Sequence, residues 1–467
     1  MGGPLSIAFQ GAARTVTGSR HHIRFGERTW LFDCGLYQGH RDEADGINRT
    51  FVSPPGSLDT LVISHAHLDH IGNVPTLVSQ GYAGRVHCTT PTAELAAFML
   101  ADSAHLMQQD AEHLARHGKA RAGARPLYGA QHVTETVSRF VTHDYHAPWD
   151  LFPDVRVEYF DAGHILGSAL TTFTFRNGER TFRLGMSGDL GRGHRPILRD
   201  PEHHPAVDAM VLESTYGDRF HASADATTRG LCEAVSRTIA RGGRVLIPSF
   251  AVGRTQEVVA TLHGLIRDGT CPDAPIFVDS PMAREATEVF TRHPECFDAE
   301  TAEAFRRGGE PFGFRRLRYV ATPDESRSLN DLREPCIIVA ASGMCEGGRI
   351  LHHLAHGLGD PKNTVLFVGY QGDGTLGRRL LDHATTVNVL GEPVRVGAEI
   401  AALDGFSAHA DQGELVAWVT ALDPMPKRIF LVHGDLGPAE TLAGVLRQRT
   451  PAEVFVPEKN QEFALWS

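Results

Sequence analysis

The sequence predicts an α/β protein in which a parallel-sheet segment is inserted into a first domain rich in strands. Its 467 residues exceed what one hydrophobic core usually supports, so we expect two domains. Strand-like alternation dominates up to about Tyr216, where short apolar runs begin to alternate with helical patterns, as in parallel sheets. A tail after about Gly397 is too short for a third domain and is expected to complete the first. The predicted domains are therefore residues 1–215 with 397–467, and residues 216–396.

Two elements of the first part have clear local signals. Residues 171–184 alternate on both sides of Asn177-Gly178, the kind of pair that best predicts a tight hairpin turn. A long helix is predicted from Thr90-Pro91 towards Gly118, because threonine caps helices and proline is favoured in their first turn.

The inserted segment and the tail alternate between strand and helix. In the insertion, strands are expected at residues 245–247, 276–278, 337–339 and 365–368, and helices at 228–240, 255–266 and 284–291. In the tail, strands are expected at residues 399–403, 429–432 and 454–456, and helices at 411–421 and 440–448. Several strands end in Gly or Ser-Pro turns, where open α/β sheets usually place ligands.

The composition is that of an ordinary globular protein, with 42% hydrophobic and 22% charged residues, and it argues against disorder. No run approaches the roughly 20 apolar residues of a membrane span, and the N-terminus lacks a basic start followed by an apolar stretch. The seven cysteines are scattered without a Cys-x-x-Cys pair, which is typical of thiols in a reducing compartment. We therefore expect a cytoplasmic enzyme.

The net charge of −11 is unfavourable for a protein that binds a polyanion, so any nucleic-acid site must be a local basic surface. Three segments supply candidates: residues 116–125, with Lys119 and Arg121; the cluster Arg306, Arg307, Arg315, Arg316 and Arg318; and Arg378-Arg379. Each segment taken alone is expected to be a solvated face.

The most informative stretch is His65-Ala66-His67-Leu68-Asp69-His70, which places four candidate metal ligands in six residues. It follows the apolar run at residues 61–63, which predicts a buried strand. Imidazole and carboxylate groups without thiolate suit zinc or another first-row divalent ion. Two such ions side by side can activate water and hold both oxygens of a phosphoryl displacement. The stretch therefore predicts a site for two cations.

Further histidines and acids follow apolar or glycine-rich signals elsewhere in the chain. They are Asp33, His164, Asp189, Glu213 and His433. Each alone is a weak signal, because a single histidine at a strand end is more often structural than a ligand.

The order of these residues resembles the metallo-β-lactamase superfamily, whose motifs carry an acid, a His-x-His-x-Asp-His run, a His, an Asp and a final His. Further segments resemble the β-CASP group of nucleic-acid-processing nucleases within that superfamily. They begin at Leu212-Glu213-Ser214, Pro248-Ser249-Phe250, Asp279-Ser280-Pro281, Ala341-Ser342-Gly343, Gly369-Tyr370-Gln371 and Phe406-Ser407-Ala408-His409. The resemblance spans nearly the whole chain. It implies a metallo-β-lactamase αββα sandwich with an inserted parallel-sheet β-CASP domain.

The resemblance also implies roles for individual residues. His65, His67 and His164 would bind one zinc ion, Asp69, His70 and His433 a second, and Asp189 would bridge the two. Asp33 is expected to orient ligands without binding metal itself. Glu213 would hold His409 protonated as a general acid. Manganese or iron in place of zinc stays open.

The function implied is hydrolysis of phosphodiester bonds in single-stranded RNA that passes between the domains, leaving 5′-phosphate and 3′-hydroxyl ends. RNA is favoured over DNA because RNA-processing members are expected to have histidine, and DNA-processing members valine, at the position of His433. Arg254, Arg378, Arg379 and Ser407 are the candidate substrate contacts. Phe250, Tyr370 and Phe406 are candidate stacking platforms, although a core role is favoured for each.

Three other functions stay open: a single-stranded DNA nuclease, a thioester or lactam hydrolase, and a catalytically silent RNA-binding scaffold. The scaffold is disfavoured because none of the motif ligands is missing. The sequence favours internal cleavage without deciding between it and digestion from a 5′ end. The RNA target and homodimer formation also stay open.

Overall fold

The computed structural model describes residues 3–39, 41–116 and 125–466, so the basic candidates Lys119 and Arg121 lie outside the described residues. The chain divides into two compact units. Unit 1 contains Met1–Gly193, Asp200–Phe220 and His409–Ser467, and unit 2 contains His194–Arg199 and His221–Ala408. The units are described separately below.

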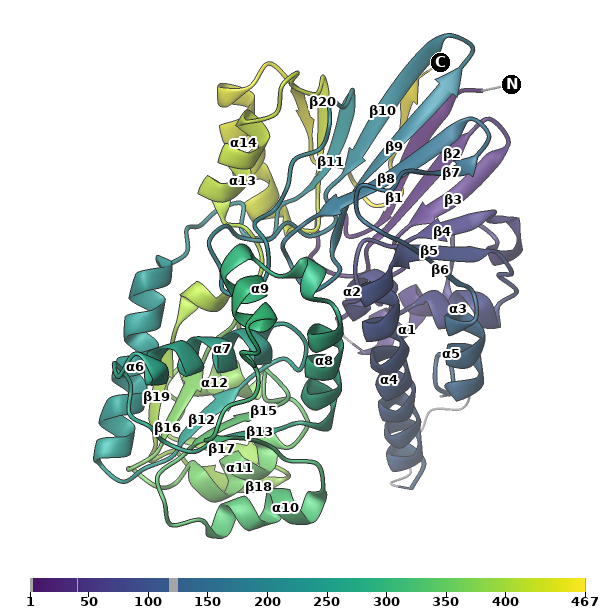
Figure 1. The fold of residues 1–467 in the computed structure, drawn as a ribbon. Helices are drawn as coiled ribbons and strands as arrows, with labels where there is room; N and C mark the ends of the chain where they lie inside the picture. Colours follow the sequence, from purple (N-terminus) through teal and green to yellow (C-terminus); the bar gives the residue numbers. More distant parts are fainter. Residues whose placement is uncertain (1–2, 40, 117–124, 467) are drawn as a thin grey trace. The chain divides into compact units, whose positions relative to one another are not determined.

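Unit 1 contains two seven-stranded sheets (Figure 1). The first has the order β22 (Glu462–Trp466), β1 (Leu5–Gly11), β2 (Arg20–Phe25), β3 (Arg28–Phe32), β4 (Thr60–Val62), β5 (Arg85–Thr89) and β6 (Phe140–His143). The second has the order β21 (Glu453–Phe455), β20 (Arg428–Val432), β11 (Ala209–Glu213), β10 (Arg180–Met186), β9 (Ala169–Asn177), β8 (Val155–Asp161) and β7 (Trp149–Phe152).

Helices cover the outer faces of these sheets. They are α1 (Arg41–Arg49), α2 (Leu68–Ile71), α3 (Val74–Ser79), α4 (Thr90–Arg116), α5 (Ala130–Val137), α13 (Gln412–Thr420) and α14 (Leu436–Arg449). Fully buried rings such as Trp30 and Phe173 pack between the two sheets, and each buried side chain of this size contributes about 1.5–3 kcal/mol. Leu415 and Leu442 bring α13 and α14 against the second sheet (Figure 1). The predicted αββα sandwich is confirmed.

The local predictions for unit 1 hold in part. The Asn177-Gly178 hairpin joins β9 to β10 in antiparallel register, with Gly178 at φ 63°, and the long predicted helix is α4. The sequence reading missed α1, α2, α3 and α5, because these helices of four to nine residues are too short for a clear helical periodicity.

The carboxyl ends of several strands in unit 1 carry the motif residues. In the first sheet β3 and β4 run parallel, so Asp33 and the His65–His70 run follow neighbouring strand ends. In the second sheet β10, β11 and β20 run parallel. Asp189, Glu213 and His433 consequently gather at one edge of that sheet.

Unit 2 contains a six-stranded parallel sheet, flanked by helices, and a separate hairpin (Figure 1). The sheet order is β14 (Leu317–Tyr319), β13 (Ile276–Asp279), β15 (Ile337–Ala340), β12 (Val245–Pro248), β16 (Thr364–Phe367) and β19 (Glu399–Ala402). The hairpin joins β17 (Thr386–Val389) to β18 (Glu392–Arg395). The helices are α6 (Ala224–Ala240), α7 (Arg254–Arg267), α8 (Pro281–Arg292), α9 (Ala299–Arg306), α10 (Pro323–Ser328), α11 (Ile350–Gly357) and α12 (Leu376–Leu381).

The structure corrects one predicted boundary. The sequence reading assigned the strand at 399–403 to the tail of the first domain, but β19 pairs in parallel with β16, from Thr364↔Glu399 to Phe367↔Ala402. The strand therefore belongs to unit 2, and unit 1 resumes at His409. The error arose because a short strand carries no local sign of the sheet that it joins.

Candidate metal centre

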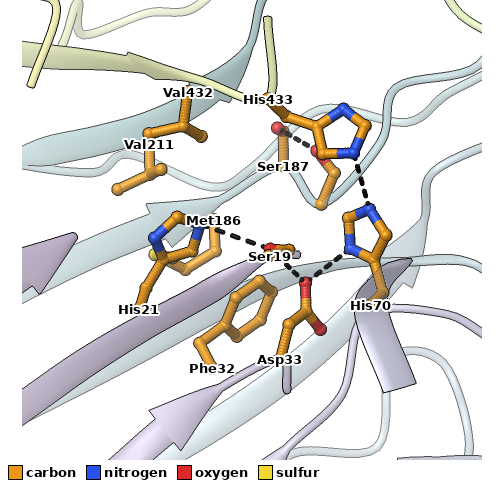
Figure 2. Close-up of a pocket in the computed structure, with 11 residues that line it drawn as sticks. Ser19, His21, Phe32, Asp33, His70, Met186, Ser187, Val211, Val432 and His433 are labelled. Atoms are coloured by element: carbon orange, nitrogen blue, oxygen red, sulfur yellow. Dashed lines mark hydrogen bonds and ion pairs between the residues drawn. The ribbon is translucent and has the colours of Figure 1, made fainter. Parts of the chain in front are cut away.

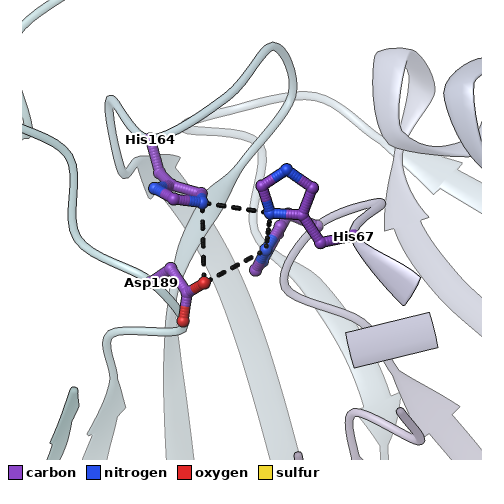
Figure 3. A group of neighbouring side chains, drawn as sticks. His67, His164 and Asp189 are labelled. Atoms are coloured by element: carbon purple, nitrogen blue, oxygen red, sulfur yellow. Dashed lines mark hydrogen bonds and ion pairs between the residues drawn. The ribbon is translucent and has the colours of Figure 1, made fainter. Parts of the chain in front are cut away.

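Four side chains of unit 1 form the first group of candidate ligands (Figure 3). The side chains of His65, His67, His164 and Asp189 each offer one donor atom, and all four atoms lie within 4.8 Å of one another. His67 Nδ1 lies 3.1 Å from His65 Nε2 and 3.2 Å from His164 Nε2. Asp189 Oδ2 lies 3.4 Å from His65 Nε2 and 3.5 Å from His164 Nε2.

A second group adjoins the first through Asp189. Asp69, His70 and His433 offer donor atoms within the same limit. His70 Nε2 lies 3.1 Å from His433 Nε2, and His433 Nε2 lies 3.4 Å from Asp69 Oδ2. The other carboxylate oxygen of Asp189, Oδ1, lies 3.2 Å from His70 Nε2. Asp189 therefore presents one oxygen to each group.

These spacings fit divalent cations. Ligands at the corners of a tetrahedron about 2.0–2.1 Å from zinc are separated by roughly 3.3 Å, and the four distances given above for the first group are 3.1–3.5 Å. Asp189 Oδ1 is buried and makes no hydrogen bond in the structure, although a buried polar atom normally has a partner. The donor set of imidazole and carboxylate is also the one that zinc accepts. The residues present therefore fit a metal centre.

The electrostatics of the histidines agree with this reading. Burial lowers the pKa of His65 to about 3 and that of His67 to about 4, so both rings are neutral, as metal ligands must be. Burial also lowers the pKa of His70, but the carboxylates of Asp189 and Asp33 outweigh this effect and raise it well above its ordinary value. A cation that binds at His70 therefore displaces a proton.

Asp33 lies behind His70, at the edge of a small pocket (Figure 2). Its Oδ2 lies 2.7 Å from His70 Nδ1 and accepts hydrogen bonds from the hydroxyls of Ser19 and Ser64, at 3.1 and 3.0 Å. The backbone N–H of Ser64 donates to Oδ1 at 2.8 Å. These bonds orient the ring of His70, which is compatible with the role that the resemblance implies for Asp33, and that role stays a prediction. The sequence reading missed Ser19 and Ser64, because isolated serines carry no motif signal.

Glu213, which is buried, and His409, which is partly exposed, form a pair beside the two groups. His409 Nδ1 lies 3.0 Å from Glu213 Oε1 and 3.9 Å from Asp189 Oδ2. Glu213 is fully buried and accepts backbone hydrogen bonds from Leu190 at 2.8 Å and Thr215 at 3.2 Å. Burial lowers the pKa of His409, but Glu213 and Asp189 outweigh it and raise the pKa to about 9. The pair therefore favours a protonated imidazole.

Backbone contacts hold His409 in this position. Gly191 and His409 form an isolated antiparallel bridge, and the N–H of Ala410 donates to the carbonyl of Leu190 at 2.8 Å. The segment that follows Asp189 therefore positions His409 directly, although the two residues are far apart in the sequence.

The four predicted substrate contacts all lie in unit 2. Arg379 is exposed, Arg378 is partly exposed and bonded to Asp382, and Ser407 is buried. Arg254 departs from the prediction. Its side chain is only 10% exposed and is engaged by Glu257 and by the carbonyl of Val368. In this structure Arg254 ties α7 to the loop after β16, and its predicted role as a phosphate contact stays a prediction.

Among the described residues, no helix combines the length and the apolar character that crossing a membrane requires.

Comparisons with known proteins agree with the fold and the metal centre. A family model of the metallo-beta-lactamase superfamily matches residues 23–253, one of the Beta-Casp domain matches residues 255–380, and one of the Zn-dependent metallo-hydrolase RNA specificity domain matches residues 393–457. A solved structure, a protein of unknown function from Enterococcus faecalis V583, shares the fold with a TM-score of 0.59 at 12% identity and covers 99% of this chain and 100% of its own.

Curated relatives extend the similarity in sequence. Ribonuclease TTHA0252 of Thermus thermophilus is 38% identical over 426 residues, which cover 91% of this chain and 92% of that protein. Transcription termination factor FttA of Methanocaldococcus jannaschii is 32% identical over 466 residues, covering 97% of this chain and 70% of that protein. The chain belongs to the β-CASP family of the metallo-β-lactamase superfamily. The family predicted from the motifs is thereby confirmed.

Proposed function

We propose that the protein is a metal-dependent ribonuclease that hydrolyses phosphodiester bonds of single-stranded RNA. The ribonuclease class has the support of the RNA specificity domain at residues 393–457 and of the relative named a ribonuclease. The observation that carries the chemistry is the Glu213–His409 pair within 4 Å of Asp189, the residue whose two carboxylate oxygens face the two ligand groups.

Two zinc ions per chain are the proposed cofactors, with manganese or iron as alternatives. His65, His67 and His164 would hold one ion, Asp69, His70 and His433 the other, and Asp189 would contact both. When bound, the ions supply an activated water and neutralise the charge that develops on the phosphate. The shared carboxylate keeps the two positions together, which suits an in-line displacement at phosphorus.

His409 is the proposed general acid. Its Nδ1 is engaged by Glu213, and Nε2 is the nitrogen that would give a proton to the departing 3′ oxygen. Protonation of a leaving group by a positioned side chain contributes typically 10²–10⁴-fold to the rate. The products would carry 5′-phosphate and 3′-hydroxyl ends, and cleavage would be internal.

The finer points of the proposal rest on the sequence reading. RNA is favoured over DNA by His433, and a single strand is favoured over a duplex by the family resemblance. Homodimer formation and a cytoplasmic location also stay predictions, which size-exclusion chromatography with light scattering and cell fractionation would check.

One experiment tests the proposed function against its alternatives. The purified, zinc-loaded protein is given circular RNA, linear RNA with a 5′-monophosphate, and single-stranded DNA of the same sequence, and product ends are mapped. We expect cleavage of both RNAs to 5′-phosphate ends, little cleavage of DNA, and loss of cleavage in His409→Ala with metal retained. His356→Ala, which changes an exposed histidine on α11, is the matched control. Intact RNA after metal loading would refute the proposal, and equal cleavage of DNA would refute the RNA preference.

A further inference from the structure

Two exposed aromatic rings lie at the carboxyl edge of the parallel sheet of unit 2. Phe250 follows β12 and is 43% exposed, and Tyr370 follows β16 and is 56% exposed. Phe406, the third aromatic residue considered as a stacking platform, is 3% exposed and packs in the core of unit 2. The expected core role therefore holds for Phe406, but it is wrong for Phe250 and Tyr370.

The topology of the sheet singles out the place where the two rings lie. Strands β12 and β16 are neighbours in the order β14-β13-β15-β12-β16-β19. The chain leaves β12 towards β13 on one side, and it leaves β16 towards β19 on the other. Ligands of open α/β sheets bind at this kind of switch point, outside the carboxyl ends of the strands.

The loops that carry the rings are fixed by buried contacts. The buried amide of Gln371 donates to the carbonyl of Gly343 at 2.9 Å and so ties the loop after β16 to the loop after β15. The ring of Phe250 packs against Gly343 so closely that a Cβ at this glycine would lie 3.0 Å from two ring atoms. The ring of Phe250 and the loop that carries Tyr370 are therefore held in place before any ligand arrives, which reduces the entropy lost on binding.

In the part of the chain that the structure describes, the rings of Phe250 and Tyr370 are not stacked on other aromatic rings. Helix α12 begins directly after the loop of Tyr370 and carries Arg378 and the exposed Arg379. Arg378 is bonded to Asp382, so Arg379 is the better candidate for a phosphate contact.

We propose that Phe250 and Tyr370 form a base-stacking site for unpaired RNA nucleotides. The inference rests on the proposed function, because that function supplies RNA as the ligand class. Single strands bind through aromatic rings on which successive bases stack, and such stacking tolerates any sequence because every base has a π face. The site therefore binds the RNA strand without selecting its nucleotide sequence.

Direct binding measurements test the site without relying on cleavage. Affinity for a fluorescent single-stranded RNA is measured by anisotropy on the zinc-loaded full chain carrying His409→Ala. Adding Phe250→Ala or Tyr370→Ala should weaken binding roughly 5- to 100-fold, the range expected for the loss of one stacked base. Phe250→Tyr and Tyr370→Phe, which keep a ring, should bind nearly as tightly as the parent. Leu390→Ala removes a residue of similar exposure, 53%, from the β17–β18 turn and should have no effect.

An abasic nucleotide placed at successive positions of the RNA separates stacking from a structural effect. When the abasic nucleotide lies at the position that contacts Tyr370, the RNA should bind the parent protein more weakly than the intact RNA does. Tyr370→Ala should not weaken the binding of this abasic RNA any further, since both changes remove the same interaction. Equal weakening of the intact and abasic strands at every position would overturn the proposal, as would alanine variants that bind within twofold of the parent.

The outcomes also separate this inference from the proposed function. If the rings bind RNA but the wild-type chain cleaves nothing, the stacking site stands and the ribonuclease proposal fails. If the wild-type chain cleaves RNA while both alanine variants bind normally, the ribonuclease proposal stands and the stacking site fails.

Discussion

Replacing Glu213 by glutamine tests the most specific feature of the centre, the charged partner of His409. In the structure the carboxylate accepts hydrogen bonds from two backbone N–H groups and faces His409 Nδ1 at 3.0 Å. Glutamine keeps the size of the side chain but removes its charge and turns one acceptor into a donor. Hydrogen bonds to charged groups are worth about 1.5–3 kcal/mol, so we expect a fall of roughly 10- to 150-fold in kcat for Glu213→Gln.

The assay is cleavage of a single-stranded RNA by zinc-loaded enzyme over a range of pH. KM and zinc content should stay near wild type, because Glu213 belongs to neither ligand group. Since Glu213 raises the pKa of His409, the alkaline limb of kcat should move to lower pH in the variant. Glu399→Gln, which changes a surface glutamate that pairs with Arg237 and Arg241, is the control. A normal kcat with an unchanged alkaline limb would refute the general-acid assignment.

Three further predictions follow from the contacts described above. Asp189→Ala should lose zinc as well as activity, because the two oxygens of this carboxylate face the two ligand groups; elemental analysis that finds two zinc ions in the variant would contradict this. Asp33→Asn should weaken zinc binding about 10- to 100-fold by releasing His70, as measured by chelator competition, and unchanged affinity would argue against it. Asp279→Ala should cost about 3–5 kcal/mol in the free energy of unfolding near pH 7, because it leaves the buried His353 and the largely covered Arg349 without their carboxylate. Burial raises the pKa of Asp279, but hydrogen bonds from His353, Ser326 and Arg349 outweigh burial and lower the pKa below its ordinary value. The stability that Asp279 contributes is therefore present above the unfolded pKa of about 3.9 and is lost as pH falls through the lower folded pKa. The difference between wild type and variant in urea unfolding should therefore shrink below about pH 4, and a constant difference would count against the assignment.

The sequence alone was sufficient for the family and the fold class, and it named the candidate ligands that the structure brings together. These predictions succeeded because the signals are local: His65 to His70 are spaced for metal binding within six residues, and Asn177-Gly178 specifies a turn by its own backbone preference. The order of motifs along the chain supplied the rest, through resemblance to a family. The roles of the individual site residues stay predictions until the experiments above are done.

Only the tertiary structure decided which residues meet and which are buried. Three features depend on segments that are distant in the sequence. They are the place of β19 in the sheet of unit 2, the hydrogen bonds from the hydroxyls of Ser19 and Ser64 to Asp33, and the burial of the Arg254 side chain. The contrast between Phe406 in the core and exposed Phe250 and Tyr370 is of the same kind. Burial results from packing among many elements, and the local pattern around an aromatic residue does not specify which neighbours cover it.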